Sequence, residues 1–281
     1  MKNDRPIYSY SKLTCFEQCQ KQYYFTYILK KESGDNIYSL AGNALHNSVE
    51  KMQLGEIDNE EAERRFLEEL DMAKIFGYEF PSQKVEYNYI ESIKHYLKHY
   101  KPIDEDDIKV EIEKEFIVDI KGHLIRGFID LLIIHSDNSV DIYDYKSSSM
   151  YNKNAIIEHS KQLLIYALAM EQEGYKVNSV QWLFAKYAKI KTKRSTKNIL
   201  RCDLDENQEF EECLVSYPVT EETLQECEDW VCNIIEQIEE KGEDEENWIT
   251  NCDSGFFCNT LCGHCKYCPK AKQLKNSFFN Q

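Results

Sequence analysis

The sequence contains no apolar run that approaches the roughly 20 residues needed to cross a bilayer. Residues 1–6 are charged and polar, so they give no sign of a secretory signal. No Gly-x-x-x-x-Gly-Lys-Ser/Thr motif is present, which argues against a built-in helicase motor. Positive charge is also scarce, because 34 basic residues face 50 acidic ones and leave a net charge of −16. These absences predict a cytoplasmic protein with no membrane partner and no generally basic coat for nucleic acid.

One stretch departs from this acidic background. Between residues 186 and 201 the sequence has seven basic residues and no acid. Such a local island can contact phosphate groups, although a solvated loop is the alternative interpretation. The residues that we assign as nucleic-acid contacts are Lys186, Lys189, Lys191, Lys193, Arg194 and Lys197.

A β-hairpin with two acids is the centre of the predicted chemistry. Residues 124–134 and 140–146 form two β-branched runs, and the polar residues 135–139 between them are typical of a hairpin turn. Asp130 lies on the first strand. Asp144 and Lys146 are two residues apart on the second strand and therefore share a face, with Tyr145 on the other. Converging carboxylates favour Mg²⁺ or Mn²⁺ and metal-assisted phosphodiester hydrolysis, whereas the alternative is a hairpin with ordinary solvated charges.

The remaining pattern alternates helices and strands. We expect helices at 39–54, 59–76, 82–100, 154–173 and 220–240, and strands at 108–118, 178–189 and near 198–204. His46 lies early in the first of these helices. Gln162 and Tyr166 are four residues apart and share a helical face. Near the N-terminus, Ser11 is expected to cap a helix on which Cys15 and Cys19 are neighbours.

Eleven cysteines are many for a reducing compartment, where disulfides are rare. Five of them, Cys252, Cys258, Cys262, Cys265 and Cys268, lie close together near the C-terminus. This spacing predicts a structural metal or an iron–sulfur cluster, with a redox-active thiol pair as the alternative. The spacing does not separate zinc from iron and sulfur. With Cys262, Cys265 and Cys268 as three ligands, the spacing also leaves the fourth ligand open among Cys258, His264 and Cys19.

Five motifs follow one another in a fixed order along the chain. They are Tyr10-Ser11-x-Leu13…Cys19, Gly42-x-x-x-His46, Glu113…Gly127-x-x-Asp130, Asp144-x-Lys146 and Gln162-x-x-x-Tyr166, and the cysteine cluster follows them. The arrangement resembles the RecB-like branch of the PD-(D/E)xK nucleases, of the type with a C-terminal cysteine cluster seen in AddB and in CRISPR-associated RecB-like exonucleases. The resemblance covers most of the chain and is weakest at residues 56–105.

The resemblance implies an α/β fold with a restriction-endonuclease-like core, in which helices flank a central mixed β-sheet. Residues 1–281 would form a single nuclease domain that carries a helical insertion at 56–105. A cysteine-rich tail at 252–270 would pair with residues 8–30.

The resemblance also implies roles for individual residues. The divalent metal, Mg²⁺ or Mn²⁺, would be held by His46, Asp130, Asp144 and the carbonyl group of Tyr145. Lys146 would position the attacking water, and Gln162 and Tyr166 would line the DNA side of the site. A [4Fe–4S] cluster would be held by Cys19, Cys262, Cys265 and Cys268. Cys258 is an alternate ligand and zinc an alternative metal, because Gln20 replaces the usual proline after Cys19 and the last tail spacing is short.

The implied activity is metal-dependent hydrolysis of DNA, most simply by an exonuclease acting on single- or double-stranded ends. Recombination, repair or phage DNA processing would be its setting, with a recombination protein or a CRISPR-adaptation protein as partner. The alternatives are a CRISPR-adaptation nuclease and a non-catalytic DNA-binding or scaffold protein that keeps the same fold.

Overall fold

The computed structural model describes residues 5–105 and 107–271. The chain divides into two compact units. The smaller unit comprises the described residues of Met1–Asn36, Ile117–Gly127 and Leu224–Gln281, and the larger unit comprises those of Ile37–Phe116 and Phe128–Thr223. No helix in the described ranges is long and apolar enough to cross a membrane.

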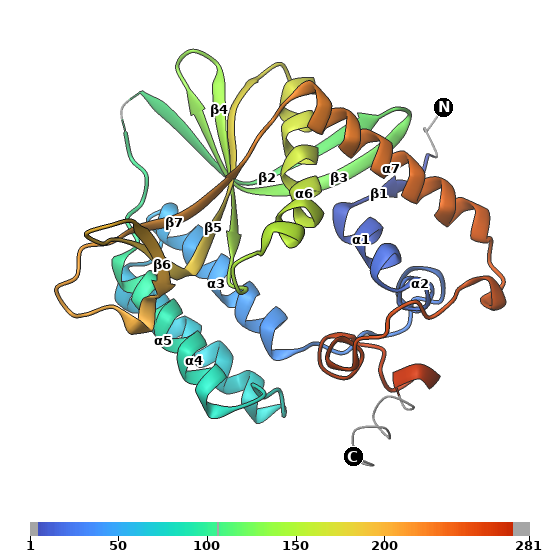
Figure 1. The fold of residues 1–281 in the computed structure, drawn as a ribbon, viewed down its shortest axis with the longest axis horizontal. Helices are drawn as coiled ribbons and strands as arrows, with labels where there is room; N and C mark the ends of the chain where they lie inside the picture. Colours follow the sequence, from blue (N-terminus) through green and yellow to red (C-terminus); the bar gives the residue numbers. More distant parts are fainter. Residues whose placement is uncertain (1–4, 106, 272–281) are drawn as a thin grey trace. The chain divides into compact units, whose positions relative to one another are not determined.

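Three helices form one layer of the larger unit (Figure 1). They are α3 (Ile37–Gln53), α4 (Asn59–Ile75) and α5 (Gln83–His99). Asp58 caps α4 by accepting a hydrogen bond from the Glu61 N–H at 2.8 Å, and Ser82 caps α5 in the same way. The buried faces of the three helices pack together and against strand residues such as Leu131 and Leu183. Burial of these apolar faces stabilises helices whose outer faces are highly charged.

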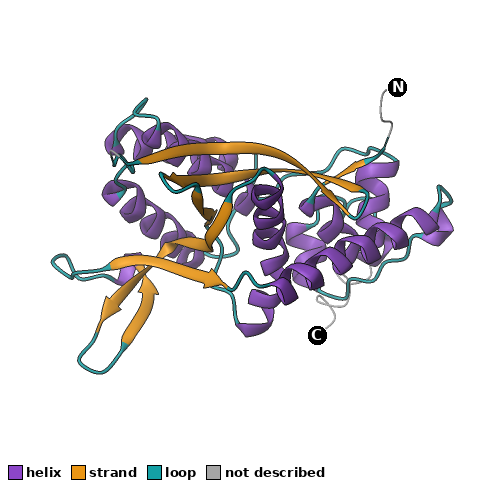
Figure 2. Cartoon of the chain, turned by 90° about the horizontal axis from the view of Figure 1, so that it is seen from above, coloured by secondary structure: helices purple, strands orange, loops and turns teal. Residues whose placement is uncertain are grey.

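A mixed β-sheet supports the candidate site. Six of its strands are β2 (Ile108–Ile120), β3 (His123–His135), β4 (Ser139–Lys146), β5 (Lys176–Lys191), β6 (Thr196–Leu200) and β7 (Glu211–Tyr217). Residues 117–120 of β2 and 123–127 of β3 belong to the smaller unit. Strand β4 is antiparallel to β3 and parallel to β5, and α6 (Lys153–Gln172) provides the crossover that a parallel pair requires. Figure 2 shows the strands in orange among the helices. The predicted fold class, a central mixed sheet flanked by helices, is confirmed.

The two faces of β4 meet different helices. Tyr145 is buried in the apolar cluster formed by α3, α4 and α5. Asp144 and Lys146 face the other way and contact Tyr166 and Gln162 of α6. The strand therefore separates a polar face from an aromatic one, as its residue alternation predicts.

The end of the sheet differs from the sequence prediction in two ways. The strand expected near 198–204 is wrong in its second half, because β6 ends at Leu200 and Arg201–Asp203 form a 3₁₀ turn. The turn buries the Arg201 guanidinium, which donates to the Tyr187 carbonyl at 3.1 Å and pairs with Glu212. Strand β7 pairs with β5 and was not predicted. The acidic residues that precede and begin it obscure its apolar alternation.

The smaller unit contains β1 (Ile7–Tyr8), α1 (Tyr10–Gln18), α2 (Gln20–Tyr23) and α7 (Glu221–Lys241). The helix cap is Ser9 rather than the expected Ser11, and its hydroxyl accepts a hydrogen bond from the Lys12 N–H. The expectation that Cys15 and Cys19 share a helical face is also wrong, because α1 ends at Gln18 and Cys19 is extended with φ −160°.

Aromatic side chains form the core of the smaller unit. Phe16, Tyr23 and Tyr24 are buried, and the Trp248 ring stacks on Tyr23 with ring centres 5.4 Å apart. Packing of this kind contributes through buried area as well as ring geometry.

His95 makes the stability of the protein depend on pH. Burial, together with the nearby His99 and Arg201, lowers the pKa of His95 to about 4. Because the folded-state pKa lies below the unfolded value of about 6.5, this contribution to stability is present above pH 6.5 and is lost as the pH falls towards 4. We expect the His95→Gln variant to lose less unfolding free energy than the wild type between pH 7 and pH 5 in urea titrations. Equal losses would contradict the assignment.

Candidate metal centre and thiol cluster

The Asp130 and Asp144 side chains lie close to the Tyr145 backbone of β4. The Asp130 Oδ2 atom accepts a hydrogen bond from the Tyr145 N–H at 2.7 Å. Both acids are buried, and Asp144 is only 1% exposed. Burial raises the pKa of Asp130 well above its usual value, and the Asp144 carboxylate raises it further. Two buried acids in this arrangement repel each other unless a cation or a proton lies between them.

His46 completes this side of the site from α3. Its Nε2 atom lies 3.1 Å from the Tyr145 carbonyl oxygen. Its Nδ1 atom lies 3.6 Å from Asp130 Oδ2. Burial lowers the pKa of His46, which favours the neutral ring. A neutral imidazole beside carboxylate and carbonyl oxygens is a donor set that a bound cation satisfies.

Glu113 joins these groups from β2. Ligand atoms of His46, Glu113 and Asp130 all lie within 4.8 Å of one another, so the three residues can hold a metal ion. Glu113 has a φ of +48°, an unusual value that interrupts the regular strand and redirects its side chain. Partial burial of the carboxyl group raises the pKa of Glu113, and Glu50 and Asp144 raise it further. The motif order includes Glu113, but the sequence alone gave it no ligand role.

A hydrogen-bonded chain connects Lys146 with α6 and Asp144. The Lys146 ammonium donates to Gln162 Oε1 at 3.0 Å, and the Gln162 amide donates to the Tyr166 hydroxyl at 2.7 Å. The Tyr166 hydroxyl reaches Asp144 Oδ1 at 3.5 Å. Lys146 Nζ also forms an ion pair with Asp144 Oδ2 at 2.5 Å.

Lys146 keeps its proton in this environment. Burial disfavours the charged ammonium, but attraction to Asp144 outweighs it and raises the pKa of Lys146 above its usual value. A cationic lysine can orient an anionic or polar group and stabilise developing negative charge. The residues of the candidate metal site and of its hydrogen-bonded chain all belong to the larger unit.

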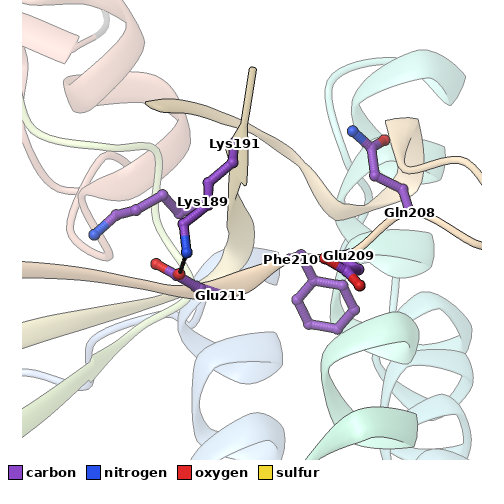
Figure 3. A pocket seen from close by; sticks show the side chains of 6 residues that line it. All are labelled: Lys189, Lys191, Gln208, Glu209, Phe210 and Glu211. Atoms are coloured by element: carbon purple, nitrogen blue, oxygen red, sulfur yellow. Dashed lines mark ion pairs between the residues drawn. The ribbon is translucent and has the colours of Figure 1, made fainter. Parts of the chain in front are cut away.

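The basic residues of β5 and β6 do not form one uniform surface. Lys186 is half-buried against the Tyr89 and Tyr187 rings, and burial lowers its pKa to about 8. Lys191 pairs with Glu211 at 2.7 Å, as the dashed line in Figure 3 marks. Three residues at the tip of the β5–β6 hairpin, Lys193, Arg194 and Lys197, are exposed and have no ion-pair partner among the described residues.

Four cysteines of the smaller unit line a small shared cavity. They are Cys19, Cys258, Cys262 and Cys268. Cys265 is not among the lining residues, although the resemblance implies it as a ligand. The Cys252 and Cys258 sulfurs lie 3.6 Å apart, which is too long for a disulfide. All eleven cysteines are free thiols.

The backbone around Cys19 is suited to a thiolate. The N–H groups of Gln22 and Lys21, in the first turn of α2, point at its sulfur and act to lower the pKa of Cys19, although burial raises the pKa overall. The tail is held next to the N-terminal segment by the Gly34 N–H, which donates to the Gly263 carbonyl at 2.9 Å. A Cβ atom at residue 263 would overlap the Gly34 backbone, so this contact requires glycine.

With this geometry in view, the comparisons with known proteins identify the family. A family model described as the PD-(D/E)XK nuclease superfamily matches residues 7–271. The chain therefore belongs to the PD-(D/E)XK nuclease superfamily, whose members are generally divalent-metal-dependent nucleases. A search of the curated proteins finds no match. The crystal structure of SSO0001 is similar at 13% identity and a TM-score of 0.38, over 96% of this chain and 87% of that one, which is too low to add to the assignment.

Manganese binding should stabilise the folded protein. At a free Mn²⁺ concentration of 100 times the dissociation constant, linkage predicts about 2.7 kcal/mol of added stability. The Glu113→Gln variant should bind Mn²⁺ roughly tenfold more weakly and lose about 1.4 kcal/mol of this gain. The matched variant Glu115→Gln, on the same strand, should respond like the wild type. Chemical denaturation with and without Mn²⁺ measures the gain, and an undiminished gain in Glu113→Gln would remove this residue from the ligand set.

Proposed function

We propose that the protein is a divalent-metal-dependent deoxyribonuclease of the RecB-like branch, which acts as an exonuclease on DNA ends. Recombination, repair or phage DNA processing is the setting we favour. The main support for this proposal is that His46, Asp130 and Asp144 lie around one residue of β4, Tyr145, with Lys146 beside them. A DNA-binding scaffold has no need for four such groups around one point.

The proposed metal ligands are an imidazole nitrogen of His46, carboxylate oxygens of Asp130 and Asp144, and the Tyr145 carbonyl oxygen, and we add Glu113. The donors are an imidazole and hard oxygen atoms, a set that suits Mg²⁺ or Mn²⁺. The neutral His46 ring beside Asp130 and the burial of both acids support this assignment. When bound, the ion would polarise the scissile phosphate and lower the pKa of a water molecule.

Lys146 is proposed to orient the attacking water and to stabilise negative charge in the transition state. Its raised pKa supports a cationic role and argues against a role as general base. Gln162 and Tyr166 are proposed to act by holding Lys146 and Asp144 in place, as their hydrogen bonds suggest. These contacts give both residues a positioning role besides the predicted place beside the DNA.

Lys193, Arg194 and Lys197 are the members of the basic island best suited to contact the DNA backbone. Their exposure and lack of ion pairs in the described structure support this choice. Lys189 is a weaker candidate, and Lys186 and Lys191 are already engaged with tyrosine rings and with Glu211. Contacts of this type supply affinity that depends on salt rather than on sequence.

We also propose that the cysteines hold a [4Fe–4S] cluster, as in the AddB type of nuclease. The proposed ligands are Cys19, Cys258, Cys262 and Cys268, which line one cavity.

Substitutions at the metal centre test the nuclease assignment. We expect Asp144→Asn and Lys146→Ala each to lower Mn²⁺-dependent DNA cleavage by about 100- to 1000-fold, because each removes charge that acts on the transition state. The Lys153→Ala variant changes an exposed lysine at the start of α6 and should retain wild-type activity. Cleavage of end-labelled DNA, with an EDTA control and circular dichroism to confirm folding, measures the effect. Full activity in both variants would end the assignment.

The choice between Cys258 and Cys265 can be tested without any activity assay. We expect protein purified under anaerobic conditions to absorb near 400 nm, roughly where thiolate-bound iron–sulfur centres do. Cys258→Ser should lose this band together with most of its iron, and Cys265→Ser should keep both. The opposite pattern would restore Cys265 to the ligand set, and colourless wild-type protein that contains zinc would overturn the cluster.

A further inference from the structure

The larger unit contains a second cavity, of about 460 Å³, on the aromatic face of the sheet. It is bounded by the end of α5, by residues of β3, β4 and β5, and by β7. Its volume falls in the range of roughly 300–1,000 Å³ that small-molecule sites occupy. Six aromatic or imidazole rings line it: Tyr96, His99, Tyr100, Tyr143, Tyr145 and Phe210. Such a concentration of rings favours a flat aromatic ligand that can stack.

One buried polar group in the cavity wall lacks a partner. Tyr96 is 1% exposed, and its hydroxyl has no hydrogen-bond partner in the part of the chain that the structure describes. Leaving a buried hydroxyl unpaired is unfavourable, so such groups usually bind a ligand or an ordered water. The neighbouring Tyr100 hydroxyl, in contrast, donates to Gln53 Oε1 at 2.7 Å.

The other polar groups that line the cavity determine which functional groups a ligand needs. The His99 Nδ1 atom donates to the His95 carbonyl oxygen, which leaves Nε2 of the neutral ring as an acceptor. Glu212 adds a carboxylate that is only partly occupied by Arg201. Lys101 lines the same cavity, is exposed and forms no ion pair within the described ranges. The cavity therefore offers acceptors for an amino group and one cation for an anionic group.

This cavity is separate from the metal centre. Tyr145 contributes its side chain to the cavity, whereas Asp144 and Lys146 project from the opposite face of β4. The Tyr145 hydroxyl is hydrogen-bonded to that of Tyr100. The candidate metal site and the cavity thus lie on opposite faces of β4.

We propose that this cavity binds a nucleoside monophosphate with an amino-substituted base. The base stacks among the tyrosine and phenylalanine rings, and its exocyclic amine donates to Glu212 or His99. The Tyr96 hydroxyl bonds to a ring nitrogen, and the phosphate pairs with Lys101. Base stacking on aromatic side chains is a general source of affinity for nucleotides. The proposal concerns binding alone and does not depend on cleavage.

The test is calorimetric titration of the full chain with dAMP in EDTA, so that no metal can recruit the phosphate elsewhere. We expect dAMP to bind, deoxyadenosine to bind roughly tenfold more weakly for lack of the phosphate, and dTMP to bind more weakly for lack of the amine. Tyr96→Phe removes only the hydroxyl and should weaken dAMP binding roughly three- to tenfold. The matched variant Tyr89→Phe alters a buried tyrosine outside the cavity and should bind dAMP normally.

Two lysine variants distinguish a direct contact with the phosphate from a general effect of positive charge. Lys101→Ala should reduce the affinity for dAMP to that for deoxyadenosine, and Lys98→Ala, which changes an exposed lysine in the last turn of α5, should leave it unchanged. Failure of dAMP to bind at millimolar concentration would overturn the proposal. Binding that persists unchanged in both Tyr96→Phe and Lys101→Ala would also overturn it, because the ligand would then occupy another site.

Discussion

The candidate metal site depends on how one residue of β4, Tyr145, is held. The N–H of Tyr145 donates to Asp130 and its carbonyl oxygen lies 3.1 Å from His46 Nε2, so two side chains from distant segments meet the backbone of a single residue. The neighbouring Asp144 and Lys146 are held by α6 through Gln162 and Tyr166. Negative charge concentrated in this way is unfavourable in a protein interior without a cation. The raised pKa of Asp130 reflects that constraint, and a divalent ion relieves it.

Strand alternation lets the same strand serve two purposes. One face of β4 carries the charged groups, and the other carries tyrosines that pack into the apolar cluster of α3, α4 and α5. The aromatic face fixes the strand, and a fixed strand holds the candidate metal ligands in position. In the smaller unit, the cysteine cavity is organised by a different device, the break between α1 and α2 that turns backbone N–H groups towards Cys19.

The parts of the fold that sequence could predict are those with strong periodicity. The β3–β4 hairpin, the helix after it and the three helices before it follow from regular apolar spacing and turn residues. Strand β7 could not be predicted, because acidic residues obscure its short alternation. The ligand position of Glu113 depends on a left-handed backbone conformation within a strand, which no propensity indicates. The sequence favoured Cys265 and kept Cys258 only as an alternate ligand, because the cavity that Cys258 lines forms only when distant segments pack.

The most direct test of the central idea is a crystal of the protein soaked in Mn²⁺ and measured at the manganese absorption edge. The account predicts an anomalous peak within coordination distance of His46, Asp130 and Asp144. Glu113 and the Tyr145 carbonyl oxygen should lie around the same peak. A map with no peak at this point, or with manganese bound only at the acidic surface, would contradict it.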